Sequence, residues 1–411
     1  MDELSRRKML IVGGGALGAL ASLGAASPAR ALSSWTWGPS GSVAGSGAGA
    51  DPRWVWDAEA DPLVASILER GEVARVNELL RTWTRNDQPL PPGLPEDLRA
   101  FMERARQLPS WADRAKLDRA AGFTETKGTY LLLGYGLGSG MMSTAIPGEA
   151  RAVYYSKGGA DMKDRIAKTT KLGVDLHELN AYHPDGHIMV TAVKTRLVHA
   201  AVRHLLPQSP GWSRTGGGRI PISQNEILVT WHSLPTFVMR KLTDWRVPVS
   251  PAESAAFLHL WQVNAHMLGV LDEYIPASWE AAEAQSRQIL DPVMGPTPEG
   301  VELADTLLTM ASQAAGPGAP LARPLLNALT RYVAGDRVAD WVAIPREPVW
   351  DPLIRTGFPQ FVALREKLIP LPLIPPIAWI LDEAIRKLLM FYLSEGKPVN
   401  IEIPDVNRPA S

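Results

Sequence analysis

The sequence contains no cysteine among its 411 residues. A disulfide, a thiolate metal site, an iron–sulfur cluster and a cysteine nucleophile are therefore excluded. An excess of one charge is also lacking, because 42 Lys and Arg face 43 Asp and Glu. This balance argues against a broad phosphate-binding surface, so we expect no nucleic-acid partner. No apolar run reaches the ~20 residues that a membrane helix needs, so we expect no membrane span.

The remaining composition is that of a folded globular protein, with 45% hydrophobic and 21% charged residues. A disordered chain and a collagen-like repeat are excluded by this mixture. Since cysteine is absent, any transition-metal chemistry has to use histidine, carboxylate, methionine, tyrosine or lysine ligands.

The first 31 residues have the pattern of an export signal. Arg6-Arg7-Lys8 precedes a weakly apolar stretch over 12–26, and Ala29-Arg30-Ala31 supplies small residues for cleavage. The paired arginines resemble a twin-arginine signal. The alternative, the start of a cytosolic amphipathic helix, is opposed by three glycines at 13–15. We expect 1–31 to direct export through the twin-arginine machinery and to be removed from the mature chain, and the protein to be secreted, as an exported cofactor enzyme would be.

The rest of the chain is predicted to be all-α. Residues 32–56 are rich in Gly, Ser, Ala and Trp and read as an arm, whereas apolar residues recur every three or four positions from residue 60. We expect no fixed repeat and one large domain, divided into an N-terminal arm and helices (32–120), a core (121–345) and a C-terminal elaboration (346–411). The predicted helical stretches include 60–80, 130–142, 161–172, 190–206, 223–242, 251–270, 278–290, 299–311, 321–333, 352–368 and 377–393.

Three short segments carry separate predictions. The proline-rich segment 369–376 should be a stiff extended connection, because proline disrupts helices. Residues 399–403 are the one candidate strand. Gly134 to Gly140 is glycine-rich but does not match a nucleotide-binding loop, so these glycines should permit close approach of another helix or a cofactor.

All eight histidines lie between 177 and 266, which is the most informative feature of the sequence. His199 lies on a mostly apolar helical stretch with Ala200, and Arg196 and Arg203 within a turn or so. Such a helix suits a haem, since imidazole binds iron, a small residue admits the flat ring and arginine pairs with propionates. Composition alone favours the alternative, a histidine in the core whose hydrogen bonds are satisfied by the protein.

The other histidines have weaker patterns. His183 and His187 flank a Pro-Asp-Gly turn, which opposes the helical geometry that a zinc or copper pair at this spacing would use. His259 and His266 share one helix face and are expected to lie in the core or to line a pocket.

Two further sets of polar residues are candidates for a site. Arg165, Lys168 and Thr169 share one helix face, although a solvated face explains them equally well. Glu149 follows Pro147-Gly148, where a turn can present a carboxylate to a pocket, although an isolated glutamate is ordinarily a surface residue.

Taken together, these segments strongly resemble the latex-clearing proteins, a family of rubber oxygenases. The resemblance is carried by Glu149, 165–170 (RIAKTT), 194–204 (KTRLVHAAVRH), 230–235 (TWHSLP) and the proline-rich 369–376. It implies a globin-like helical core that holds one noncovalent b-type haem in 121–345. Covalent attachment is excluded in any case, because the required cysteines are absent.

The resemblance also implies a role for individual residues. His199 would be the proximal iron ligand, and Lys168 a distal ligand in a closed state, which requires a neutral amine. Arg165 and Thr169 would lie in the distal pocket. The acid/base group would be Glu149, oriented by Arg165. Arg203 and Thr230 would support the cofactor site.

The implied reaction is endo-type cleavage of the C=C bonds of poly(cis-1,4-isoprene) by dioxygen, to oligo-isoprenoids with keto and aldehyde ends. The protein would act as an extracellular monomer. Two alternatives remain open: a haem peroxidase or oxygenase for small hydrophobic substrates, and a noncatalytic exported haem-binding module. A copper or zinc enzyme that uses His183 and His187 is a more distant alternative.

Overall fold

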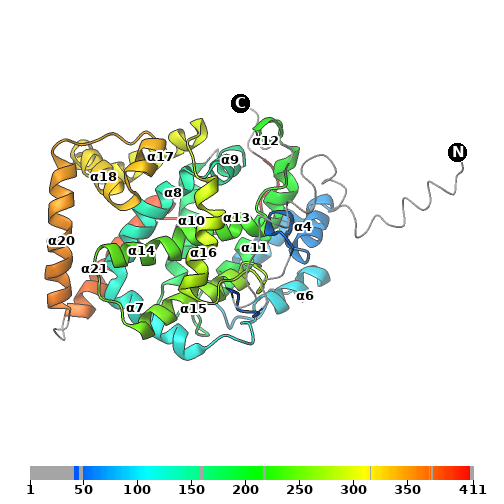
Figure 1. The fold of residues 1–411 in the computed structure, drawn as a ribbon. Helices are drawn as coiled ribbons and strands as arrows, with labels where there is room; N and C mark the ends of the chain where they lie inside the picture. Colours follow the sequence, from blue (N-terminus) through cyan, green and yellow to red (C-terminus); the bar gives the residue numbers. More distant parts are fainter. Residues whose placement is uncertain are drawn as a thin grey trace, which may run out of the picture.

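The structure is a computed structural model that describes residues 41–45, 50–156, 161–215, 219–314, 316–369, 371 and 374–407. The predicted export signal, 1–31, lies outside the described residues. The described chain is helical throughout (Figure 1), and its only strand-like pairing is a single antiparallel bridge between Ser42 and Pro276. The all-α prediction is confirmed. No described helix combines the length and the apolar character needed to cross a membrane.

The N-terminal helices form a small layer around one face of a later helix, α11. Val64, Ile67 and Val76 come from α4 and α5 and bury their side chains together with Val193 and Leu197 of α11. This burial fixes the position of α11. The N-terminal elements are the 3-10 helix η2 (Pro52–Trp54), α4 (Ala60–Glu69), α5 (Val73–Arg81) and α6 (Glu96–Ala105).

The central helices enclose the main hydrophobic core, in which α15 packs against α7. The apolar stretch predicted over 130–142 is one helical rod, made of α7, a π-helical turn η3 and α8. The elements of this part are α7 (Arg114–Leu133), η3 (Gly134–Ser139), α8 (Gly140–Thr144), α9 (Pro147–Tyr155), α10 (Met162–Leu176), α11 (Ile188–Leu205), η5 (Leu206–Gln208), α12 (Pro210–Thr215), α13 (Gln224–Trp231), η6 (His232–Thr236), α14 (Phe237–Asp244), α15 (Pro251–Met267) and α16 (Trp279–Ile289).

The C-terminal helices cover the other end of the core. In Figure 1, α18 and α20 lie at the edge of the molecule opposite α4 and α6, while α21 packs against α7 and α10. The elements are η7 (Asp291–Val293), α17 (Pro298–Gln313), η8 (Gly316–Gly318), α18 (Ala319–Ala334), α19 (Asp336–Trp341), α20 (Trp350–Leu368) and α21 (Ile374–Ser394).

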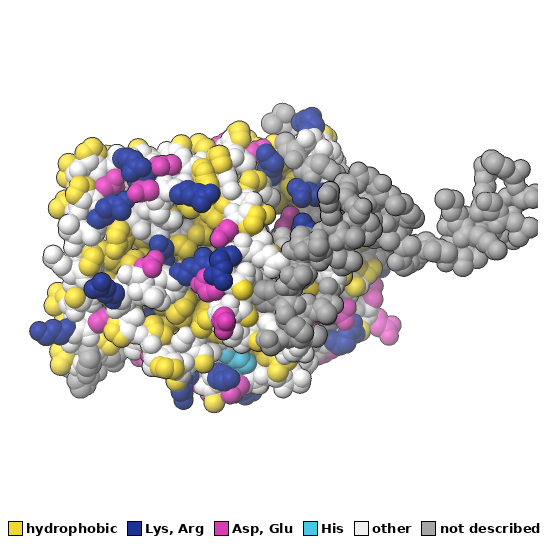
Figure 2. Space-filling model, in the orientation of Figure 1, with side chains coloured by type: hydrophobic (Ala, Val, Ile, Leu, Met, Phe, Trp, Pro, Cys, Tyr) yellow, Lys and Arg dark blue, Asp and Glu magenta, His cyan; other side chains and the backbone are white. Residues whose placement is uncertain are grey.

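Charged side chains of both signs are interspersed on the face that Figure 2 shows. Hydrophobic side chains lie between them, and this face carries no broad area of a single sign. On this face, basic and acidic side chains therefore lie near one another and are not separated into a positive and a negative side.

Two of the local predictions are wrong. The connection predicted to be extended over 369–376 is helical at its end, because α21 begins at Ile374 and includes Pro375 and Pro376; residues 370, 372 and 373 lie outside the described residues. The first turn of a helix accepts proline because its backbone N–H groups have no partner within the helix. The second error concerns 399–403, which form no strand: the N–H and C=O of Ile403 instead pair with the side chain of Asn77.

The glycines of η3 allow two helices to approach the central rod closely. A Cβ at Gly134 would lie 2.9 Å from Val238 Cγ2, and one at Gly138 would collide with the ring of Phe237 and lie 3.0 Å from Val333 Cγ1. Helices α14 and α18 therefore pack against η3 at positions where only glycine fits, as the sequence suggested for helix contacts.

Gly138→Ala should lower the free energy of unfolding by about 1–3 kcal/mol, because the added methyl overpacks a filled contact. Gly122→Ala is the matched control in α7, where an added Cβ meets nothing within 4 Å. That variant should be neutral or stabilised by up to ~1 kcal/mol through its helix propensity. Urea denaturation measures both, and equal stabilities of the two variants would contradict the packing argument.

Candidate functional site

His199 lies in α11 with a buried ring nitrogen, Nδ1, that has no hydrogen-bond partner among the described residues. Burial, together with the positive charges of Arg203 and Arg165, lowers the pKa of this imidazole to about 3. The ring is therefore neutral at physiological pH and keeps a lone pair that no protein group uses. A neutral, unpartnered imidazole is the form in which histidine coordinates a metal.

The face of α11 around His199 is only partly packed. Val198 and Val202 are partly exposed, as is Ile227 on α13, although α13 runs through the middle of the ribbon in Figure 1. Ala200, which the sequence suggested would leave room for a flat ring, is instead buried against the N-terminal helices. The residues beside His199 that have room for a neighbouring group are thus the two valines.

Glu149 is the second group of the site, and it occupies the first turn of α9 and not a separate turn. The hydroxyl of Thr230 on α13 donates a hydrogen bond of 2.6 Å to Glu149 Oε1. Burial raises the pKa of Glu149 to about 8; the Thr230 hydrogen bond and the charge of Arg165 lower it, and nearby Glu226 raises it. This carboxyl group consequently titrates near neutral pH, as a group that takes up and releases protons must.

Arg165 joins these two groups through its charge. It lies on α10, and its electrostatic effect reaches both Glu149 and His199. Burial lowers the pKa of Arg165, and Glu149 opposes that shift. The family resemblance implied that Arg165 orients Glu149; in this structure the carboxyl group also accepts a hydrogen bond from Thr230. Helices α9, α10, α11 and α13 therefore bring four of the predicted residues together.

The other two α10 candidates lie differently in this structure. Lys168 Nζ forms an ion pair of 2.6 Å with Asp164 Oδ2, one turn earlier on the helix. Thr169 is exposed. The ammonium of Lys168 would have to leave Asp164 before it could act as a distal ligand.

The guanidinium of Arg203 already has partners within the protein. Its Nε and Nη2 each lie 2.7 Å from Asp61 Oδ1, and its Nη1 donates to the carbonyl of Ile222. Arg196 forms the equivalent pair with Asp57. Sequence reasoning missed these two aspartates. The available signal was their spacing: the aspartates are four positions apart, and the two arginines that they pair with are seven positions apart on α11.

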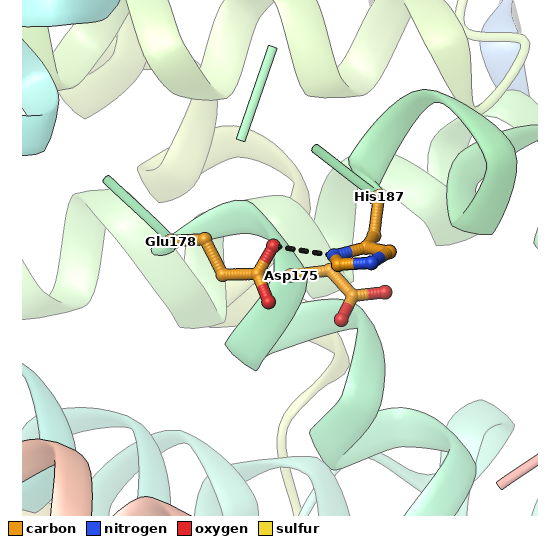
Figure 3. Close-up of side chains that lie close together, drawn as sticks. All are labelled: Asp175, Glu178 and His187. Atoms are coloured by element: carbon orange, nitrogen blue, oxygen red, sulfur yellow. Dashed lines mark hydrogen bonds and ion pairs between the residues drawn. The ribbon is translucent and has the colours of Figure 1, made fainter. Parts of the chain in front are cut away.

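A further polar cluster of Asp175, Glu178 and His187 lies at the end of α10 and the start of α11 (Figure 3). Its oxygen and nitrogen atoms lie within 4.8 Å of one another, as metal ligands would. However, Glu178 accepts a hydrogen bond from His187 Nδ1 (2.8 Å), and both oxygens of Asp175 accept from Lys171. The carboxylate oxygens are thus already occupied by Lys171 and His187, and the cluster carries no metal proposal.

His183 does not join His187, because its Nε2 lies 2.8 Å from Asp118 Oδ1 instead. The histidine pair considered for zinc or copper is thus divided between two carboxylates. His259 and His266 have structural partners: the former accepts from the backbone N–H of Asp113, and the latter bonds to Asp272.

Three comparisons show which known proteins this chain is similar to. The family model described as "ER-bound oxygenase mpaB/B'/Rubber oxygenase, catalytic domain" matches residues 126–364. The chain is 61% identical to the rubber oxygenase of Streptomyces sp. (strain K30) over 411 residues, which cover all of both chains. A solved structure of latex clearing protein in the closed state matches with a TM-score of 0.81 and 61% identity, covering 90% of this chain and all of that one.

Glu149→Gln should remove a pH dependence from the stability of the fold. The folded-state pKa of Glu149, about 8, lies above its ordinary value of 4.5, so the folded protein retains a proton that the unfolded chain loses between these values. The contribution of Glu149 is therefore full below pH 4.5 and is lost as pH rises through 8. Relative to the variant, the melting temperature of the parent should fall across this window.

The charge-matched control is Glu302→Gln, which removes a carboxylate from the exposed surface of α17. Thermal melts from pH 4.5 to 9 measure the differences. A constant difference between Glu149→Gln and the parent would show that Glu149 titrates as it does in the unfolded chain.

Proposed function

Because the chain belongs to the rubber oxygenase family, we propose that it cleaves the C=C bonds of poly(cis-1,4-isoprene) with dioxygen. Each cleaved double bond would yield one ketone and one aldehyde. The observation that carries the proposal is a neutral, unpartnered His199 beside the Glu149–Thr230 pair, in a chain 61% identical over its whole length to a rubber oxygenase.

The cofactor that fits this site is haem b, an iron protoporphyrin bound without covalent attachment. His199 supplies the neutral imidazole that an axial iron ligand requires, and the partly exposed valines beside it accept a flat apolar ring. When bound, the haem iron supplies the activation of dioxygen, which side chains alone cannot perform.

Two further residues would support the cofactor only after changing partners. Lys168 could occupy the distal side of the iron once its ion pair with Asp164 breaks. Arg203 could pair with a propionate only by leaving Asp61, so in this structure it anchors the helix that carries His199. Thr169 would take a place on the distal side with Lys168, its neighbour on α10.

Glu149 moves a proton in the proposed reaction. The net reaction of one C=C with one O₂ places one oxygen atom on each of two carbonyls and consumes no proton. A carboxylate that accepts an allylic proton must therefore return it within the same turnover, and a pKa of about 8 allows both transfers near neutral pH. Thr230 holds the carboxyl group in position, and the charge of Arg165 favours its ionised form.

The location of the substrate agrees with the predicted export signal. A solid polymer cannot enter a cell, so the enzyme has to meet it outside. We therefore propose that residues 1–31 direct twin-arginine export and that the mature chain acts outside the cell as a monomer.

The cofactor assignment is tested by the absorption spectrum of the purified protein. We expect a Soret band and a b-type pyridine haemochrome at about one haem per chain. His199→Ala should lose most of the haem, whereas His204→Ala, five residues along the same helix, should retain it. Lys168→Ala should retain haem with an altered spectrum. Full retention in His199→Ala, or an unchanged spectrum in Lys168→Ala, would reject the respective ligand.

The reaction is tested by oxygen uptake with poly(cis-1,4-isoprene) latex in the absence of peroxide, together with detection of carbonyl products. Glu149→Gln should lower the rate by about 100- to 10 000-fold while haem is retained. Thr230→Val should lower it less, and Thr230→Ser, which keeps the hydroxyl, should restore it. Turnover that needs peroxide would favour the peroxidase alternative, and full activity of Glu149→Gln would remove its role as a base.

A further inference from the structure

Helix α21 leaves a row of large apolar side chains in solvent. Leu381, Ile385, Leu388 and Phe391 follow the spacing i, i+4, i+7, i+10, so they form one stripe along the helix, and Ile380 lies beside it. These five side chains are 50–67% exposed. We call them the α21 stripe.

The opposite face of the same helix buries charge. Asp382 is 3% exposed and Arg386 is 9% exposed. Asp382 Oδ1 accepts a hydrogen bond from Thr129 on α7, but Asp382 Oδ2 and Arg386 Nη2 are buried without a partner among the described residues. A surface helix normally buries its apolar face and exposes its charges. Helix α21 departs from this rule at Asp382, at Arg386 and along the stripe, although Lys387 stays exposed. An apolar partner on the stripe would remove the cost of exposing these side chains to water.

We propose that the α21 stripe is the surface by which the enzyme adsorbs to solid poly(cis-1,4-isoprene). This proposal rests on the function proposed above. The polymer has no charge and no hydrogen-bonding group, and neither do the five side chains of the stripe. Burying exposed aliphatic and aromatic side chains against a hydrocarbon is favourable because it removes apolar surface from water.

The position of α21 connects this surface to the site. Helix α21 packs against α10, which carries Arg165, and Lys163 of α10 pairs with Glu395 just beyond α21. Polymer held on the stripe is therefore held by a helix that packs directly against α10. Such attachment raises the local concentration of double bonds near the site without a new contact within it.

Other occupants fit the stripe less well. A stable protein interface uses roughly 20–30 residues on each side. Even together with the exposed Leu353, Phe361, Leu364 and Leu368 of α20, the stripe provides too few apolar residues, which disfavours a second copy of the chain. A helix that lies on a lipid membrane points Lys and Arg outward to reach the head groups. Of the two cations of α21, Arg386 is buried, and the exposed Lys387 pairs with Glu383 on the same helix, so the helix offers little free positive charge to head groups.

The test compares adsorption with turnover in the cofactor-loaded protein. The variant Ile385→Gln/Leu388→Gln makes the stripe polar, and Leu321→Gln/Val406→Gln is the control because it replaces two equally exposed apolar residues outside α20 and α21. Adsorption is measured by flotation with protein-free poly(cis-1,4-isoprene) particles. Turnover is measured on the same particles and on a short oligo-isoprene dispersed in detergent.

We expect the stripe variant to adsorb about tenfold less than the parent and the control, since two buried aliphatic contacts are lost. Its turnover of particles should fall in parallel, and its turnover of the short oligo-isoprene should stay unchanged. Flotation does not require catalysis, so the adsorption result is independent of the proposed reaction. If the proposed reaction is wrong, neither substrate will be turned over, whatever the flotation result.

Three results would overturn the proposal. Equal adsorption of the stripe variant and the control would show that the particle binds elsewhere. Stronger flotation of the parent with phosphatidylcholine vesicles than with polymer would identify a membrane surface. A parent that sediments as a dimer and a stripe variant that sediments as a monomer would identify a second copy of the chain as the occupant.

Discussion

The site depends on two ion pairs that fix α11 against the N-terminal segment. Arg196 pairs with Asp57 and Arg203 with Asp61, and one partner in each pair is almost completely buried. Removing one partner of such a pair typically costs about 3–5 kcal/mol, because the other charge stays buried without compensation. The helix that presents His199 therefore cannot rotate without breaking them, and the imidazole keeps its position even without a hydrogen bond of its own.

The pKa values of the site residues are set mainly by their burial. Burial is the largest cause of the pKa shifts of Glu149, Arg165 and His199, and in each case it favours the neutral form. The imidazole is kept ready to bind a metal and the carboxyl group ready to exchange a proton. One arginine near both groups sets their balance, since its charge lowers the pKa of each. In the function proposed above, this one environment serves both cofactor binding and proton transfer.

The sequence predicted the helices well because their apolar spacing is a local property. It failed at Pro375 and Pro376, where the same residue that breaks a helix interior also suits a helix start. The site was only partly predictable. His199 was distinguished from a core histidine by resemblance to a family and not by its neighbours. The Thr230–Glu149 hydrogen bond joins residues 81 positions apart, so no local pattern could reveal it.

The C-terminal helices illustrate a different limit of local patterns. The periodicity of α21 identifies an amphipathic helix but does not tell which face packs inward. In the structure, close approach to α7 decides this: a Cβ at Gly128 would lie 2.6 Å from Asp382 Oδ2, so the carboxylate fits only where α7 lacks a side chain. Glycine on one helix thus admits a charged residue from the other, and the apolar face of α21 is left outward. An enzyme for a water-insoluble polymer has a use for that face, which a protein with dissolved substrates would have to cover.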